Sequence, residues 1–240
     1  MDCLHRLIRF SLLAGCLVPA LAVAEPVSSL PTITHHQLTL QLLPDSHQLI
    51  ATDRLILSGR ASGQALSFSL APTLRVERIQ DVTHCEAACE TAPELAFERD
   101  GSAGPSEPQR VIVKQPATDR GDGAVALKFS YRGVVDDPPR DPRHLRFVTP
   151  SETSGHIGPE GVYLSSESQW YPDVEGSLAT YDVTIALPDG WTAVTQGAPQ
   201  SDQGHWIVPT KSEALTVVAN RFVVKSRTWT AKSGQSIRLA

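Results

Sequence analysis

Residues 179–187 alternate strictly between apolar side chains and polar or small ones. The apolar phase of this alternation holds Tyr181, Val183, Ile185 and Leu187. Successive side chains of a β-strand point to opposite faces of a sheet, so a period of two predicts a strand with one buried face and one face in water. No window of the sequence after residue 24 combines a helical period with helix caps. The chain is therefore expected to be built from strands.

The same alternation recurs along the chain and predicts an all-β fold. Residues 37–43 and 49–58 are expected to form an antiparallel hairpin around the turn residues Pro44, Asp45 and Ser46. Shorter strands are expected at residues 66–70, 74–82, 95–98, 111–114, 124–132, 205–208, 215–219, 222–228 and 236–239. We expect the strands at 111–114 and 124–132 to pair as a second hairpin. Short strands joined by Gly and Pro turns indicate one domain at residues 36–240, an antiparallel β-sandwich or an open saddle-shaped sheet.

One of these strands breaks its own alternation. Within residues 74–82, Ile79 falls out of phase with Val76. An extra residue near Glu77 and Arg78 returns Ile79 to the core face. The pattern therefore predicts a β-bulge at that point.

The first 24 residues predict an export signal, with an ordinary apolar helix as the alternative. Arg6 and Arg9 form a basic start, residues 10–21 an apolar run too short to span a membrane, and residues 22–24 a small-residue cleavage site. Residues 13–16 also fit a bacterial lipoprotein cleavage box, which would leave a lipid on Cys16. We expect a periplasmic or secreted protein without a transmembrane span, free or lipid-anchored, with residues 25–35 as a lead-in.

Cys85 and Cys89 are the two cysteines that follow the predicted signal. In an exported protein, two cysteines four positions apart predict a small disulfide loop, worth about 2 kcal/mol by the chain-entropy formula. C-x-x-x-C is not a redox spacing, and no second Cys/His cluster accompanies it to complete a zinc site.

The charge balance limits the class of partner. Without residues 1–24, the chain carries 19 of its 21 Lys and Arg residues and 25 of its 26 Asp and Glu residues. This acidic surplus argues against nucleic acid and anionic membranes as partners.

The sequence contains no complete catalytic constellation. Its eight histidines include no HExxH motif or other paired zinc-ligand spacing, and the G-x-S-x-G, Walker and Gly-rich dinucleotide motifs are absent. Glu167 and Asp173 can be interpreted as a carboxylate pair for glycoside hydrolysis, although solvated surface acids are the simpler interpretation. We expect this chain to contain neither catalytic nor metal-binding residues.

Residues 134–160 form a long connection rich in Pro, Asp and Arg. The oxygen and nitrogen ligands that could outline a cation site there are Asp136, Asp137, Asp141 and His144. Neighbouring arginines supply the counter-charge, so a solvated loop is predicted instead.

Trp170, Tyr171 and Pro172 place bulky aromatic surface beside a residue that has no N–H to donate. This combination predicts a strand that ends at a crowded junction. The junction is either a corner of the core or the rim of a binding site.

The order of these features resembles the N-terminal domain of the zinc aminopeptidases of the aminopeptidase N family of gluzincin metallopeptidases. The matching segments are residues 38–45, 129–133, 161–164, 170–172, 181–191 and 194–197. The resemblance implies a saddle-shaped all-β module ahead of a thermolysin-like catalytic domain. It covers most of residues 36–228.

The resemblance also implies a site. In that family, a Gln or Glu before the aromatic-Pro junction binds the free α-amino group of the peptide substrate, which places this role on Glu167, with Gln169 as the competing residue. The segment is shorter here than in the usual pattern. The family's GxMEN and HExxH motifs are absent, so the zinc and the general base are expected in a catalytic domain after Ala240. The chain alone is expected to be inactive and to bind no stoichiometric zinc.

A self-standing secreted β-sandwich for binding or scaffolding is the alternative. In that case Trp170 and Tyr171 would form an aromatic contact surface.

Overall fold

The computed structural model describes residues 31–58, 65–85, 91–100, 107–114, 124–138, 153–201, 204–223, 225 and 227–239. Within these ranges the fold is all-β, as the sequence predicted, and its helices are the short 3-10 turns η1 (Pro44–Ser46) and η2 (Ser166–Ser168). None of the described helices has the length and apolar character that crossing a membrane requires. The predicted signal at residues 1–24, Cys16 and Cys89 lie outside the described residues.

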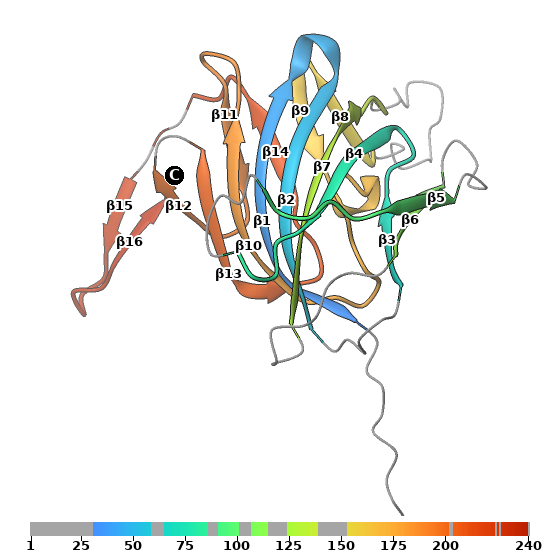
Figure 1. The fold of residues 1–240 in the computed structure, drawn as a ribbon. Coiled ribbons are helices and arrows are strands. Elements are labelled where there is room, and N and C mark those ends of the chain that lie inside the picture. Colours follow the sequence, from blue (N-terminus) through green and yellow to red (C-terminus); the bar gives the residue numbers. More distant parts are fainter. Residues whose placement is uncertain are drawn as a thin grey trace, which may run out of the picture.

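A seven-stranded sheet forms the centre of the molecule (Figure 1). Its order is β12 (Ala198–Ser201), β13 (His205–Ser212), β10 (Ala179–Ala186), β1 (Thr32–Leu43), β2 (Gln48–Ser58), β7 (Val125–Val134) and β4 (Leu74–Asp81). β1 and β2 form the predicted antiparallel hairpin around η1. β1 and β10 run parallel, whereas the sequence predicted antiparallel strands. Alternation marks the buried face of a strand equally in both orientations, so it could not reveal this pairing.

Two bulges bring apolar side chains back to the core face. The register between β4 and β7 shifts between Val76 and Arg78, which confirms the predicted bulge and leaves Ile79 fully buried. The register between β1 and β2 shifts between Ile33 and His35, so Ile33 is also fully buried. The ordered strand therefore starts at Thr32, within the segment predicted as a lead-in, because this bulge hides the alternation at the start of β1.

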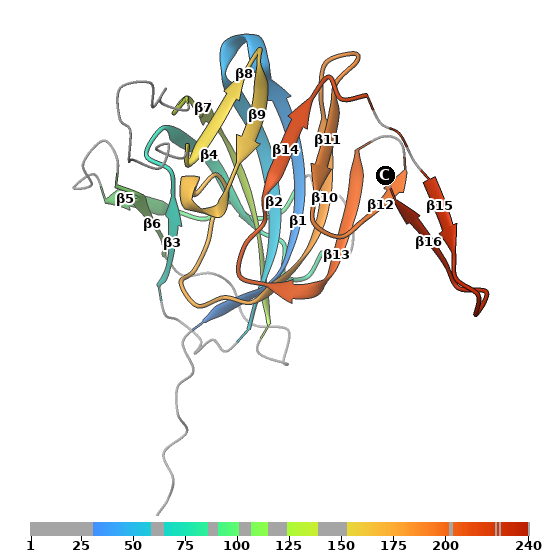
Figure 2. The ribbon, with the colours of Figure 1, turned by 180° about the vertical axis from the view of Figure 1, so that it is seen from behind.

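A four-stranded sheet covers one face of the large sheet, as Figures 1 and 2 show from opposite sides. Its order is β11 (Thr192–Thr195), β14 (Val217–Asn220), β9 (Gly161–Leu164) and β8 (Gly155–Gly158). β8 lies in the segment that the sequence assigned to a solvated loop, and all four of its residues are buried. Four residues with two glycines are too short and too small to show an alternation.

The remaining strands form smaller sheets. β3 (Leu66–Leu70), β6 (Gln109–Val113) and β5 (Phe97–Asp100) make a three-stranded sheet. β6 pairs with β3 and β5, whereas β7 pairs with β2 and β4, so the predicted hairpin of β6 and β7 is wrong. β15 (Arg227–Thr230) and β16 (Ser236–Leu239) form a hairpin that stands apart from the rest of the molecule in both views.

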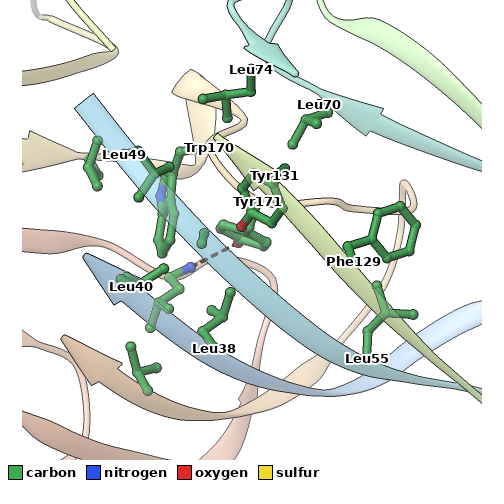
Figure 3. Close-up of a cluster of buried hydrophobic side chains, with 14 of the residues drawn as sticks. Leu38, Leu40, Leu49, Leu55, Leu70, Leu74, Phe129, Tyr131, Trp170 and Tyr171 are labelled. Carbon is green, nitrogen blue, oxygen red and sulfur yellow. Dashed lines mark hydrogen bonds between the residues drawn. The ribbon is translucent and has the colours of Figure 1, made fainter. Parts of the chain in front are cut away.

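One apolar core lies between the sheets. It joins leucines of β1 and β2 with side chains of the three-stranded and four-stranded sheets, including Phe68 and Val217. Phe68 of β3 packs edge-on against Phe129 of β7, with ring centroids 4.9 Å apart. Figure 3 shows Trp170 and Tyr171 lying over β1 and β2 in this core, beside Tyr131.

Candidate functional site

The aromatic corner, Trp170 with Tyr171 and Pro172, belongs to the core. The side chains of Trp170 and Tyr171 are 0% and 2% exposed, and their rings meet edge to face with centroids 4.7 Å apart (Figure 3). Of the two interpretations of the sequence, the core corner is the one that holds. The aromatic contact surface expected in the alternative function is wrong, because these side chains have no surface to offer.

Backbone hydrogen bonds fasten this corner to β3. The chain leaves η2 through Gln169, whose φ of 48° is in the left-handed region that non-glycine residues seldom adopt. The N–H of Ala71 donates to the carbonyl oxygen of Gln169 at 2.8 Å. Ser69 and Asp173 exchange backbone hydrogen bonds of 2.8 and 3.1 Å. These bonds fix the turn from which the side chains of Trp170 and Tyr171 enter the core.

Glu167 and Gln169 differ in how far a ligand can reach them. Glu167 lies in η2 with its side chain exposed. Gln169 is half-buried, and its side-chain oxygen is a buried atom without a hydrogen-bond partner among the described residues. Asp173 is also half-buried, and burial raises the pKa of its carboxyl. Glu167 therefore presents the accessible carboxylate of this segment.

The other predicted residues are only partly described. Cys85 is disulfide-bonded. Its proposed partner Cys89 lies outside the described residues, so the pairing itself stays a prediction. Asp141 and His144, the distal half of the possible cation site, also lie outside them.

A buried ion pair, not predicted from the sequence, lies in the core beside the aromatic corner. His36 Nδ1 is 2.7 Å from Asp53 Oδ2, and the side chains are 1% and 0% exposed. The His36 ring stacks on Tyr181 with centroids 5.1 Å apart and meets Tyr171 edge-on at 5.2 Å. Such a pair could move protons in an open cleft, but here the core encloses it. The pair therefore contributes to the packing of β1 against β2 and not to catalysis.

The signal for this pair was present in the alternation. His36 is in phase with Leu38 and Leu40, and Asp53 is in phase with Ala51 and Leu55, on the apolar faces of the two strands. A titratable residue on an apolar face requires a partner, because an unpaired buried charge is costly. The neighbouring strand supplies that partner.

The His36–Asp53 pair leaves several buried polar atoms unsatisfied. His36 Nε2, Asp53 Oδ1 and the Tyr131 hydroxyl have no hydrogen-bond partner among the described residues. Burial raises the pKa of the Tyr131 hydroxyl well above its usual value.

A second group, the histidine–carboxylate cluster, comprises His47, Asp136 and His156. A ligand atom from each residue lies within 4.8 Å of those of the other two. His156 Nδ1 is 3.1 Å from Asp136 Oδ1, and His156 Nε2 is 2.6 Å from Glu160 Oε1. No motif spacing marks this cluster in the sequence, because its members come from distant segments, and of the three only Asp136 belongs to the possible cation site at residues 136–144.

His35 provides a test of stability against pH. Its ring Nδ1 lies 2.8 Å from Thr180 Oγ1, and burial, followed by the neighbouring His36, lowers the pKa of the His35 imidazole. When folding lowers the pKa of a base below its unfolded value of about 6.5, the unfolded state binds the proton more readily than the folded state. The free energy of unfolding is therefore highest above a pH of about 6.5 and falls as the pH drops through that value. We expect the urea midpoint to fall between pH 7.5 and pH 5.5, and to fall less in His35→Gln. An equal fall in both proteins would contradict the assignment.

Comparison with solved structures shows a shared fold. The M1 zinc metallopeptidase of Deinococcus radiodurans matches 87% of this chain at a TM-score of 0.57 and 17% identity. A variant of that peptidase bound to a Tyr-Ser-Ala substrate matches the same share at 0.55 and 17% identity. Native leukotriene A4 hydrolase of Saccharomyces cerevisiae matches 87% of the chain at 0.53 and 11% identity. No protein-family model and no curated protein matches the sequence.

The match confirms the resemblance predicted from the sequence at the level of the fold. The chain spans 46% of the Deinococcus radiodurans peptidase and 31% of the yeast hydrolase. It therefore corresponds to less than half of either protein.

Proposed function

We propose that this chain is the β domain that forms one wall of the substrate cleft in an exported zinc aminopeptidase. The observation that carries the proposal is the fold shared with M1 zinc metallopeptidases over 87% of the chain. In this proposal the catalytic zinc and the general base belong to a domain outside the present sequence. Residues 1–24 direct the protein to the periplasm or the exterior.

The outer face of the four-stranded sheet carries an apolar row, and this row is evidence that another domain packs against it. Val194, Val218 and Tyr163 stand directly opposite one another on β11, β14 and β9. Val194 is 46% exposed and Tyr163 is 40% exposed. The alternate residues of the same strands enter the core, so this row faces away from it. A row of apolar side chains that is exposed at Val194 and Tyr163 and half-buried at Val218 is typical of a surface that another protein surface covers.

Glu167 is the residue that we assign to the substrate's α-amino group. Its carboxylate is exposed in the middle of the short helix η2, where an ammonium can reach it. A carboxylate binds an ammonium by charge-assisted hydrogen bonds, which are stronger than neutral ones. The buried side-chain oxygen of Gln169 is less suited to the same role.

The assignment predicts a change in substrate binding. In the full-length protein, Glu167→Ala should lower kcat/KM for peptides with a free amino terminus by about 10-fold to 100-fold, mainly through KM, because a hydrogen bond to a charged group contributes about 1.5–3 kcal/mol. Steady-state kinetics with aminoacyl substrates measures this.

Gln169→Asn is the matched control. Asparagine tolerates the left-handed backbone of this position, so the fold is kept while the side chain is shortened. We expect its KM to stay within about twofold of the unsubstituted protein. A larger effect of Gln169→Asn than of Glu167→Ala would move the assignment to Gln169.

A self-standing secreted binding module remains the second candidate, because the same exposed apolar row would also suit an independent partner. The nucleotide sequence after the codon for Ala240 separates the two. An open frame that encodes HExxH supports the aminopeptidase, and an immediate stop codon supports the module. Zinc-dependent hydrolysis of an aminoacyl substrate by the 240 residues alone would contradict the proposal that the catalytic groups lie elsewhere.

A further inference from the structure

The histidine–carboxylate cluster joins three segments that are far apart in the sequence. His47 follows η1 in the turn between β1 and β2, Asp136 follows β7, and His156 lies in β8. Asp136 Oδ1 is 3.1 Å from His156 Nδ1 and 3.7 Å from His47 Nδ1. The two imidazole rings have their centroids 5.5 Å apart. These are three side chains with atoms that ligate metal ions, converging on one point.

Backbone hydrogen bonds hold the three segments in place independently of their side chains. The N–H of Val135 donates to the carbonyl oxygen of His47 at 2.9 Å, and the N–H of Ile157 donates to that of Val135 at 2.9 Å. Asp136 and His156 also face each other in an isolated β-bridge. The side chains are therefore presented by a rigid frame, which is what a binding site with fixed geometry requires.

One ring nitrogen of each histidine has an oxygen partner outside the three residues of the cluster. For His47 that nitrogen is Nδ1, the atom that also lies 3.7 Å from Asp136 Oδ1, so His47 would bind a metal through Nε2. His156 Nε2 lies 2.6 Å from Glu160 Oε1, and His47 Nδ1 lies 2.6 Å from the carbonyl oxygen of Ile157. Histidines that bind metals are usually oriented in this way, by a hydrogen bond from the other ring nitrogen to a carboxylate or a carbonyl group. In the tautomer that donates Nε2–H to Glu160, His156 carries a lone pair on Nδ1.

His156 Nδ1 is the buried ring nitrogen that faces the cluster. The His156 side chain is 6% exposed, and Nδ1 has no hydrogen-bond partner among the described residues. It faces the Asp136 carboxylate at 3.1 Å. Two electron-rich atoms this close repel each other unless a proton or a metal cation lies between them.

Gly158 has no side chain, and this leaves space for Glu160 to reach the His156 imidazole. A Cβ atom at Gly158 would lie 2.2 Å from His156 Nε2 and 2.7 Å from Glu160 Oε2. The glycine therefore permits the pair of His156 and Glu160 that orients the imidazole.

We propose that His47, Asp136 and His156 bind one divalent transition-metal ion, for which Zn²⁺ is the probe. Two imidazoles and one carboxylate suit zinc and its neighbours, whereas calcium and magnesium prefer oxygen ligands alone. Zinc bonds of about 2.1 Å place tetrahedral ligands about 3.4 Å apart. The cluster must contract from 4.8 Å, which requires the 35% exposed side chain of His47 to shift inward and its contact with the carbonyl oxygen of Ile157 to adjust.

The ion would fasten the β1–β2 turn to the end of β7 and to β8. The site is separate from the catalytic zinc of the proposed function, and it replaces the expectation from the sequence that this chain holds no metal. A protonated His156 between Asp136 and Glu160 is the competing occupant, which needs no metal.

The test counts zinc in the full-length protein without a histidine tag. After equilibration with micromolar free Zn²⁺ and dialysis, Asp136→Asn and His47→Gln should each hold one zinc per chain fewer than the unsubstituted protein. Both side chains are partly exposed, so both variants should fold, as far-ultraviolet circular dichroism can check. Asp137→Asn, which changes the adjacent carboxylate outside the cluster, should retain the full number.

A thermal readout supports the count. Zinc at about 100 times its Kd should raise the Tm of the stripped unsubstituted chain by about 5–10 °C, and should not raise that of Asp136→Asn by the same amount. Equal zinc content in the unsubstituted protein, Asp136→Asn and His47→Gln would overturn the proposal and leave the proton as the occupant. Because the expected result is a difference of one zinc, it holds whether or not a catalytic zinc is present elsewhere.

Discussion

Trp170→Ala should lower the free energy of unfolding by about 3–5 kcal/mol, the usual cost of truncating a buried aromatic side chain to alanine. Trp170 is fully buried and supports Tyr171 edge-on, so its removal leaves a cavity against β1 and β2 that the fastened turn cannot collapse to fill. Urea unfolding followed by far-ultraviolet circular dichroism measures the change.

Glu167→Ala is the control for this substitution, three positions earlier in the same segment. Its side chain is exposed, so the free energy of unfolding should change by no more than about 0.5 kcal/mol. Together the two variants separate a stabilising residue from a surface residue. A similar loss in the free energy of unfolding for both variants would contradict the assignment of Trp170 to the core and Glu167 to the surface.

Asp53→Ala should also cost about 3–5 kcal/mol, because it removes one partner of a buried ion pair and leaves the other without compensation. The pair has a separation of 2.7 Å, and both side chains are essentially inaccessible to solvent. Thermal unfolding should show a fall in Tm of about 6–20 °C.

The double variant His36→Leu with Asp53→Leu tests the cause of that loss. Replacing both partners of a buried ion pair by apolar residues is often neutral or stabilising. We therefore expect the double variant to be more stable than Asp53→Ala. If it were as unstable as the single variant, the loss would come from packing rather than from the orphaned imidazole.

The alternation of apolar residues predicted the features that depend only on which side chains of a strand face the core. The hairpin of β1 and β2 and the bulge before Ile79 both follow from which side chains must face the core. Partner choice between strands does not follow from alternation. β6 has the same apolar pattern whether it pairs with β7, as predicted, or with β3 and β5, as observed.

The candidate sites divide in a similar way. The segment around Glu167 was found because its neighbours resemble a known pattern, although the sequence left open whether Trp170 was buried. The histidine–carboxylate cluster depends on η1, β7 and β8 meeting at one corner, and no spacing along the chain encodes that meeting. The His36–Asp53 pair was visible as two titratable residues in apolar phases, a local inconsistency that itself indicates a special position.

The parallel pairing of β1 with β10 also has a consequence for how the chain reaches its fold. His35 and Thr180, which are partners across it, are 145 residues apart. At a synthesis rate of about 5–20 residues per second, roughly 7–30 s pass before β10 follows β1 out of the ribosome. Until then one edge of the central hairpin has no neighbour, and an unpaired edge is where strands of other chains can add. Chains that are still being synthesised are thus the most prone to aggregation. Folding should also be slow, because the pairing of β1 with β10 joins residues so distant in sequence.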